Sequence, residues 1–175
     1  MTVPLPRFNI ILAAFLLVVL SGCKTTEEKI AKDAATNMRF HVETNPDGTR
    51  YNFPVMVYRA NPIKIQVEAE AAMDEEHMDK AEVVSADEFG GYAIKITFSE
   101  RGRQFLTRVT STHKGKRLAV LARWTEMRTL AAPVINKTIT DGVFVFTPDA
   151  TREEAERIVL GLNNVIKELK KPYVF

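Results

Sequence analysis

Hydrophobic and polar residues alternate in short stretches along most of this 175-residue chain. A period of two is the pattern of a β-strand that buries one face and exposes the other. Turn-forming clusters separate these stretches, as at Asn45-Pro46-Asp47-Gly48, which predicts a hairpin. The pattern predicts strands over residues 38–43, 51–58, 63–68, 81–86, 92–98, 117–124, 133–135 and 142–146. The acidic, alanine-rich segment 69–80 fits either a short helix or a connecting loop.

Two further stretches follow the helical period instead. Ser99 is suited to cap the start of a helix over residues 100–113, with Phe105, Leu106 and Val109 on one face. Thr151 and Glu154 stand three residues apart, the spacing of a capping box. They predict a second helix that ends before Pro172. Its apolar stripe comprises Ala155, Ile158, Val159, Leu162, Ile166 and Leu169.

These elements predict an α+β fold, in which two amphipathic helices cover one face of an antiparallel β-sheet. The hydrophobic share of 46% and the charged share of 26% are ordinary for a globular protein. We divide the chain into residues 1–22 as a lipoprotein signal peptide and 23–37 as a tether. An N-terminal β-hairpin and strand region over 38–77 precedes an α+β module over 78–171.

The signal peptide is identified by Arg7, by the apolar run 8–20, and by Leu20-Ser21-Gly22-Cys23, which resembles a bacterial lipobox. In a lipobox the cysteine thiol receives a diacylglycerol. The alternative is an ordinary signal peptide with a chance cysteine. Cys23 is the chain's single cysteine, which excludes an intrachain disulfide. Lys24 follows it in place of an inner-membrane retention aspartate, so we expect a lipid-anchored protein, on the periplasmic face of the outer membrane rather than the inner.

The formal net charge of +2 gives no reason to expect nucleic acid as a partner. Basic residues do cluster on the first predicted helix and its exit. As a functional patch they could meet anionic lipid headgroups or peptidoglycan carboxylates, and otherwise they form a solvated helix face. The residues of this basic patch are Arg101, Arg103, Arg108, Lys114 and Lys116, with Arg117 next to them.

Trp124 is the chain's single tryptophan, and the pattern places it where the 117–124 strand runs into an inserted loop. Arg123, Met127 and Arg128 flank it. Large aromatic, methionine and arginine side chains are enriched at protein interfaces, which makes this group a candidate interface. The other reading is that Trp124 caps the hydrophobic core.

Candidate catalytic and metal-binding residues are sparse. His41, His77 and His113 share no ligand spacing, and no serine lies in a nucleophile elbow. The acidic residues 74–76 with Asp79 could bind calcium, but they miss the EF-hand spacing and suit a solvated loop. We therefore expect no enzyme, no cofactor and no metal.

Glycine, proline and apolar residues recur in a further pattern across the second half of the chain. They are Ala93-Ile94-Lys95-Ile96-Thr97-Phe98, Gly102, Phe105, Thr110, Gly115-Lys116-Arg117-Leu118-Ala119-Val120, Ala132-Pro133-Val134-Ile135, Phe146-Thr147 and Glu153-Glu154-Ala155. Together these residues resemble the head of the first periplasmic domain of SecD, the membrane subunit of the bacterial protein-export machine. The segment 78–84 resembles the strand that precedes this head, so the resemblance covers roughly residues 78–163.

The resemblance implies the fold and an ability to contact extended or unfolded polypeptide. Three departures limit it: no membrane helix is expected after the signal peptide, extra residues stand between Leu121 and Ala132, and the glycine-rich stretch is shortened to Thr140-Asp141-Gly142. Energy-coupled translocation is therefore not implied.

Three functional hypotheses follow. The first is a membrane-anchored, non-enzymatic adaptor that binds an envelope protein or an exported, extended polypeptide through a sheet edge or the Trp124 segment. The second is a structural lipoprotein that links membrane to cell wall through the basic helix face. The third, a hydrolase, would require polar side chains gathered in a deep pocket.

Overall fold

The computed structural model describes residues 34–86 and 91–171. The signal peptide, Cys23 and most of the tether lie outside these residues. In the described part no helix has the length and hydrophobicity needed to cross a membrane. The elements are β1 (Asn37–Val42), β2 (Asn52–Val57), β3 (Ile63–Glu68), η1 (Glu75–His77), β4 (Met78–Ser85), β5 (Tyr92–Phe98), α2 (Glu100–Thr112), β6 (Leu118–Arg123), β7 (Met127–Ala131), β8 (Val143–Phe146) and α3 (Arg152–Leu169).

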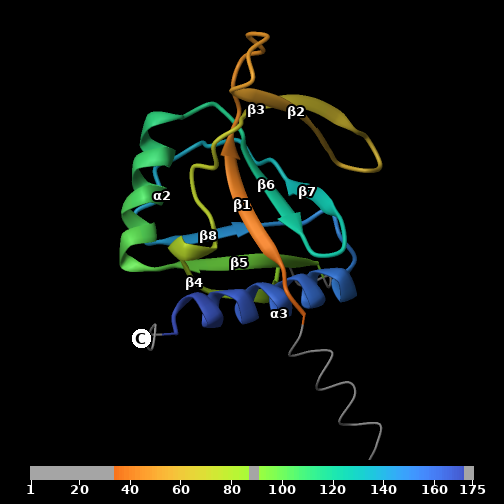
Figure 1. The fold of residues 1–175 in the computed structure, drawn as a ribbon, viewed down its shortest axis with the longest axis vertical. Coiled ribbons are helices and arrows are strands. Elements are labelled where there is room, and N and C mark those ends of the chain that lie inside the picture. Colours follow the sequence, from red (N-terminus) through yellow and green to blue (C-terminus); the bar gives the residue numbers. More distant parts are fainter. Residues whose placement is uncertain (1–33, 87–90, 172–175) are drawn as a thin grey trace, which may run out of the picture. The chain divides into compact units, whose positions relative to one another are not determined.

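All strand pairs are antiparallel, and two helices accompany them, so the predicted α+β class is confirmed (Figure 1). The strands form three groups, in the orders β1-β6-β7, β2-β3 and β4-β5-β8. β1 belongs to region 38–77 and pairs with β6 from region 78–171, so the two regions share a sheet. The undecided segment 69–80 contains the short η1 helix and the start of β4.

Both three-stranded groups and both helices enclose one hydrophobic core. Phe40 of β1 lies at its centre, with ring centroids 5.7 Å from Phe98 and 5.5 Å from Phe144. Helix α3 contributes the predicted apolar stripe from Ala155 to Ile166. It also covers the outer edge of β4, where the Asn163 amide accepts from the Ala81 N–H and donates to the Ala81 carbonyl, both at 2.9 Å. Leu169, the last residue of the stripe, is exposed.

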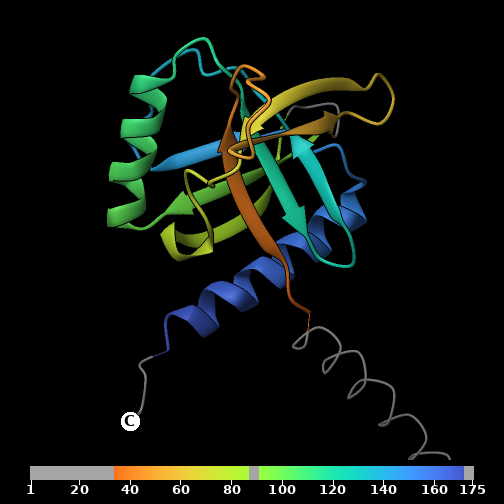
Figure 2. The same ribbon diagram turned by 45° about the horizontal axis from the view of Figure 1, so that its top comes forward.

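A second, smaller core lies on the other face of β6. Leu118, Val120 and Ala122 enter the main core, whereas Ala119 and Leu121 contact the β2–β3 hairpin. The hairpin supplies Val55, Val57, Ile65 and Val67 to this second core. Figure 2 shows the hairpin beside β7, on the side of the β1-β6-β7 sheet that the helices leave uncovered. β6 is therefore buried on both faces, which accounts for its nearly continuous hydrophobic sequence.

Two sequence expectations need correction. The segment after Trp124 is not a loop, because Met127–Ala131 forms β7 in a tight hairpin with β6. In β7 the polar Arg128 lies on the inward face and the polar Thr129 is buried on the outward face. The sequence of β7 therefore does not alternate between hydrophobic and polar residues. Conversely, Pro133–Ile135 is not a strand and makes a single bridge, between Val134 and Arg117. Pro133 has no N–H to donate to a ladder.

The helix starts follow the predicted capping chemistry. Ser99 Oγ accepts from the Gly102 N–H at 3.1 Å, and Thr151 and Glu154 form the reciprocal capping box. Gly115 ends the first helix region with a φ of +84°, a conformation that favours glycine. The predicted caps are thus confirmed at both helices.

Candidate functional site

The outer face of the β1-β6-β7 sheet is hollowed where the β2–β3 hairpin leaves it uncovered. Two hollows of about 340 and 310 Å³ share Phe53, Leu121 and Met127 in their walls. The first is also lined by Asn37, Arg39, His41, Ala69, Ala122 and Arg123, and the second by Pro54, Val55, Met56, Arg128 and Thr129. We call these together the β7 groove.

The β7 groove combines an apolar floor with cationic sides. Met127 is 67% exposed although it is large and apolar, and Phe53, which lines the same hollows, is half-buried. Arg39 and Arg123 are exposed on β1 and β6, and the strand pairing brings both of these strands to the first hollow. A surface of this composition suits a ligand with apolar side chains and carbonyl or carboxylate oxygens.

His41 closes the base of the first hollow. Its Nδ1 lies 2.8 Å from the Glu68 carbonyl oxygen, and its ring stacks edge-on against Phe53 at 5.6 Å. Burial lowers the pKa of His41 below its usual 6.5, with the nearby charge of Arg39 acting in the same direction and the contact to Glu68 opposing both. The neutral imidazole is therefore the form that the folded state favours.

This burial predicts a pH effect on stability. As the pH falls through about 6.5, His41 of the unfolded chain takes up its proton before His41 of the folded chain does. The unfolded state then binds more protons, so the free energy of unfolding falls with the pH until the folded-state pKa is passed. Urea unfolding at pH 8 and pH 5.5 should show a larger loss for the wild type than for His41→Gln. Equal losses in the two proteins would contradict this assignment.

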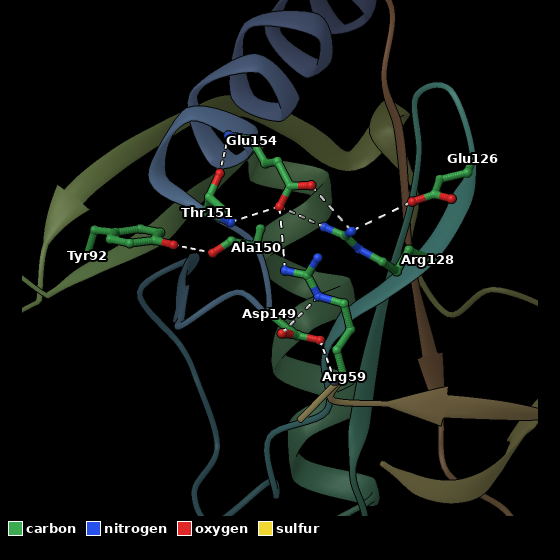
Figure 3. Close-up of polar contacts among 8 residues, drawn as sticks. All are labelled: Arg59, Tyr92, Glu126, Arg128, Asp149, Ala150, Thr151 and Glu154. Carbon is green, nitrogen blue, oxygen red and sulfur yellow. Dashed lines mark hydrogen bonds and ion pairs between the residues drawn. The ribbon is translucent and has the colours of Figure 1, made fainter. Parts of the chain in front are cut away.

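A polar network fixes the inner side of β7 (Figure 3). Arg128 Nη1 and Nη2 lie 3.4 and 3.2 Å from the Glu154 carboxylate, and Glu126 is 3.6 Å away. The Arg128 guanidinium also lies over the Trp124 ring, 4.9 Å from its centroid. Arg128 Nε is buried without a hydrogen-bond partner among the described residues. The side chain of Arg128 is thus held by α3 and by its own hairpin.

The same carboxylate joins the β2–β3 turn to the start of α3. Arg59 Nη2 lies 3.6 Å from Glu154 Oε2, and the Arg59 N–H donates to Asp149 at 2.8 Å. Glu154 also accepts from the Thr151 N–H at 2.8 Å. This backbone bond and the bonds from Arg128 hold the pKa of Glu154 below its usual range. Beside the network, the Tyr92 hydroxyl donates to the Ala150 carbonyl (Figure 3).

The four residues of the predicted interface therefore divide between two sides of the β6–β7 hairpin. Arg123 and Met127 line the β7 groove, and Arg128 borders it from its place in the network. Trp124 is half-buried, packs against the main core and lies under Arg128. The role of these residues as an interface stays a prediction. Phe53, Arg39 and His41 entered no predicted site. Phe53 lies on β2 and the other two on β1, and these strands meet at this surface only in the folded protein.

The basic patch is also less uniform than its sequence. The guanidinium groups of Arg101 and Arg108 both lie over the Phe105 ring, 5.7 and 4.6 Å from its centroid. Arg103 is paired with Glu100 and bonds to the Thr140 carbonyl, and the Arg117 guanidinium bonds to the Ala132 carbonyl at 2.9 Å. Lys114 and Lys116 are exposed beyond the helix end. Binding of an anionic ligand by the basic patch remains a prediction.

The three histidines lie in different environments. His77 Nδ1 is 2.8 Å from Asp74, which caps η1, and His113 Nδ1 is 3.1 Å from the Val109 carbonyl. Glu75, from the acidic segment, is buried and accepts from the Met38 N–H at 2.6 Å. Within residues 34–86 and 91–171, no three histidine, cysteine, aspartate or glutamate side chains are grouped as metal ligands.

Comparison with known proteins adds the family. The family described as SecDF, P1 head subdomain, matches residues 53–164, more than half of the chain. The protein translocase subunit SecDF of Thermus thermophilus is 36% identical over 78 residues, which are 45% of this chain and 10% of that protein. The chain thus spans about a tenth of that relative's length.

Two solved structures share the fold. The structure titled as that of a membrane component SecDF that enhances protein export matches with a TM-score of 0.58 and 19% identity, over 82% of this chain and 69% of that one. A SecDF crystal structure in the super-membrane-facing form has the same TM-score and identity and covers 82% of this chain and 21% of its own. Because the family match covers more than half of the chain and the fold agrees with it, the chain belongs to the SecDF P1 head subdomain family.

Proposed function

We propose that this protein is a membrane-anchored, non-enzymatic module of the cell envelope that binds extended segments of exported polypeptide. The β7 groove is the observation that carries the proposal. An exposed methionine and a half-buried phenylalanine form its floor, and Arg39 and Arg123 stand at its sides. An extended chain offers apolar side chains to such a floor and backbone carbonyls to the arginines.

Family membership supports the same role. A related protein is titled as a membrane component that enhances protein export. The chain matches the head subdomain of that family over residues 53–164. The present groove adds a specific place on that fold where a polypeptide would lie.

The anchor in this proposal is Cys23, through its lipobox. Several acyl chains together bind a bilayer strongly, since each buried methylene contributes about 0.8 kcal/mol. The lipid would keep the groove on the periplasmic side of a membrane, in the compartment that exported polypeptides enter before they fold. We place the protein on the periplasmic face of the outer membrane because Lys24 follows the cysteine.

A crosslinking experiment tests the proposal. A photoreactive phenylalanine analogue replaces Met127, and the matched control carries it at Glu156, which is exposed on α3 away from the groove. The probe is a reduced, carboxymethylated polypeptide that stays unfolded, with its folded, disulfide-bonded form as the comparison. We expect crosslinks from position 127 to the unfolded form only. Absence of these crosslinks, or equal yields from position 156, would refute binding in the groove.

A second arm of the experiment tests the anchor. The protein is expressed from its full sequence and the cells are fractionated. We expect the wild type in the membrane fraction and Cys23→Ser in the soluble fraction. A Cys23→Ser protein that stays with the membrane would refute lipid anchoring while leaving the result for the groove intact.

A further inference from the structure

Strand β8 is the outer strand of the β4-β5-β8 group (Figure 1), and within the described residues no strand pairs with its far edge. The Phe98 N–H donates to the Gly142 carbonyl at 2.9 Å, one residue beyond Thr97 and Val143, the last register pair of β5 with β8. Hydrogen-bonded pairs alternate along an antiparallel ladder, so Phe144 and Phe146 also face β5 with their backbone groups. The backbone groups of Val143 and Val145 therefore point away from β5.

The hydrogen bonds around β8 agree with this orientation. The Val143 N–H bonds to the Asp141 carboxylate at 3.1 Å, and not to a strand. Among the described residues, nothing pairs with the N–H or the carbonyl of Val145 on the open side. Val145 thus presents one donor and one acceptor, spaced as an extended chain spaces them.

A second unpaired backbone edge lies across from β8. The Leu118 N–H donates to the Pro133 carbonyl at 2.9 Å, and the Ile135 N–H donates to the Lys116 carbonyl at 2.8 Å. These bonds flank the bridge between Arg117 and Val134, so the backbone groups of Val134 point to the opposite side.

The two edges border one hollow. It has a volume of about 430 Å³, and Val134 and Val145 both line it, together with Ile139 and Phe144. The valines are 38% and 52% exposed, which is high for large apolar residues. Its volume lies within the range of roughly 300–1,000 Å³ in which ligand sites occur.

We propose that this hollow accepts a short extended segment of another polypeptide as an added β-strand beside β8. The proposal rests on the function proposed above, that the protein binds extended chains, and assigns it a second surface. An exposed row of alternating N–H and carbonyl groups is matched by another extended backbone. Apolar side chains of the guest would cover Val134 and Val145. The β8 strand of a second copy is a poor occupant, because residues 133–139 stand beside it in its own molecule.

The test measures binding of a fluorescent peptide to the full-length protein by anisotropy. The peptide alternates valine and threonine and carries a lysine at each end. A second peptide has N-methyl groups on alternate residues, which remove the N–H donors along one edge, and a third has them on the other edge. Val145→Pro removes the outward N–H without loss of a β5 bond, and Val145→Thr keeps it as the matched control. Thermal unfolding confirms that each variant is folded.

We expect Val145→Pro to weaken binding about tenfold, because the hydrogen bond from the Val145 N–H to the guest is lost and the guest carbonyl is left without that donor. Val145→Thr should bind nearly as the wild type does, and one of the two methylated peptides should lose affinity like Val145→Pro. If Met127→Ala weakens peptide binding, while Val145→Pro leaves it unchanged and both methylated peptides bind as the unmethylated one does, strand addition is refuted and binding in the β7 groove is supported. If no peptide binds, both proposals fail. Peptide-independent dimers that Val145→Pro abolishes would identify a second copy as the occupant and overturn the inference.

Discussion

Replacing Gly102 by alanine is expected to lower the free energy of unfolding by about 3 kcal/mol, the upper part of the range for an overpacked site. A Cβ atom at position 102 would lie 2.0 Å from the His77 carbonyl oxygen and 2.9 Å from its carbon. These are backbone atoms, and the Ser99 N–H and hydroxyl both bond to the same carbonyl, at 2.9 and 3.1 Å. The backbone cannot move without breaking these bonds, so α2 and η1 must separate.

Urea unfolding monitored by Trp124 fluorescence measures this change. Gln104→Ala, on the exposed face of the same helix, is the control and should stay within about 0.5 kcal/mol of the wild type. A Gly102→Ala protein as stable as this control would show that the contact between α2 and η1 is looser than described.

Replacing Glu154 by alanine should destabilise the protein by about 2 kcal/mol or more, because it leaves the charge of Arg128 without its main partner. The Arg128 side chain is only 16% exposed, and Glu126 remains as a more distant carboxylate. The change also removes half of the α3 capping box and the carboxylate that Arg59 approaches. Three contacts therefore depend on one side chain.

The control for this prediction is Glu156→Ala, whose partner Arg152 is exposed on the same helix. An exposed pair of this kind contributes less than about 1 kcal/mol. Adding Arg128→Met to Glu154→Ala should recover part of the lost stability, since the buried charge is then removed too. If the double variant is no more stable than Glu154→Ala, the loss comes from the helix cap and not from the charge of Arg128.

Local elements were largely accessible from the sequence. Alternation identified β5 with the bounds that the structure has, and the capping residues Ser99 and Thr151 identified the starts of both helices. These signals depend on residues two to four positions apart in the sequence, so they do not depend on which distant segments pack against the element. Pro133 and the mixed faces of Met127–Ala131 misled the strand assignment, because Arg128 and Thr129 reverse the polarity expected on either side of β7.

The candidate site was accessible only in part. Arg123, Met127 and Arg128 could be named because arginine and methionine beside a tryptophan are unusual in a short segment. The sequence could not predict that these residues and Trp124 lie on different sides of the hairpin, because that depends on the register of β6 with β7. His41 and Phe53 carry no signal of their own, and the Val134 and Val145 edges are visible only when the hydrogen bonds of both neighbours are known.

The order of residues alone determined the α+β class, the capped helices, most strands and the family resemblance, since each of these depends on neighbours along the chain. Tertiary structure decided how the strands divide into three groups, why Gly102 must be glycine, and which side chains border the β7 groove and the open edge of β8. The physical reason is that a backbone group or side chain becomes available for binding only when the packing of distant segments leaves it without a partner.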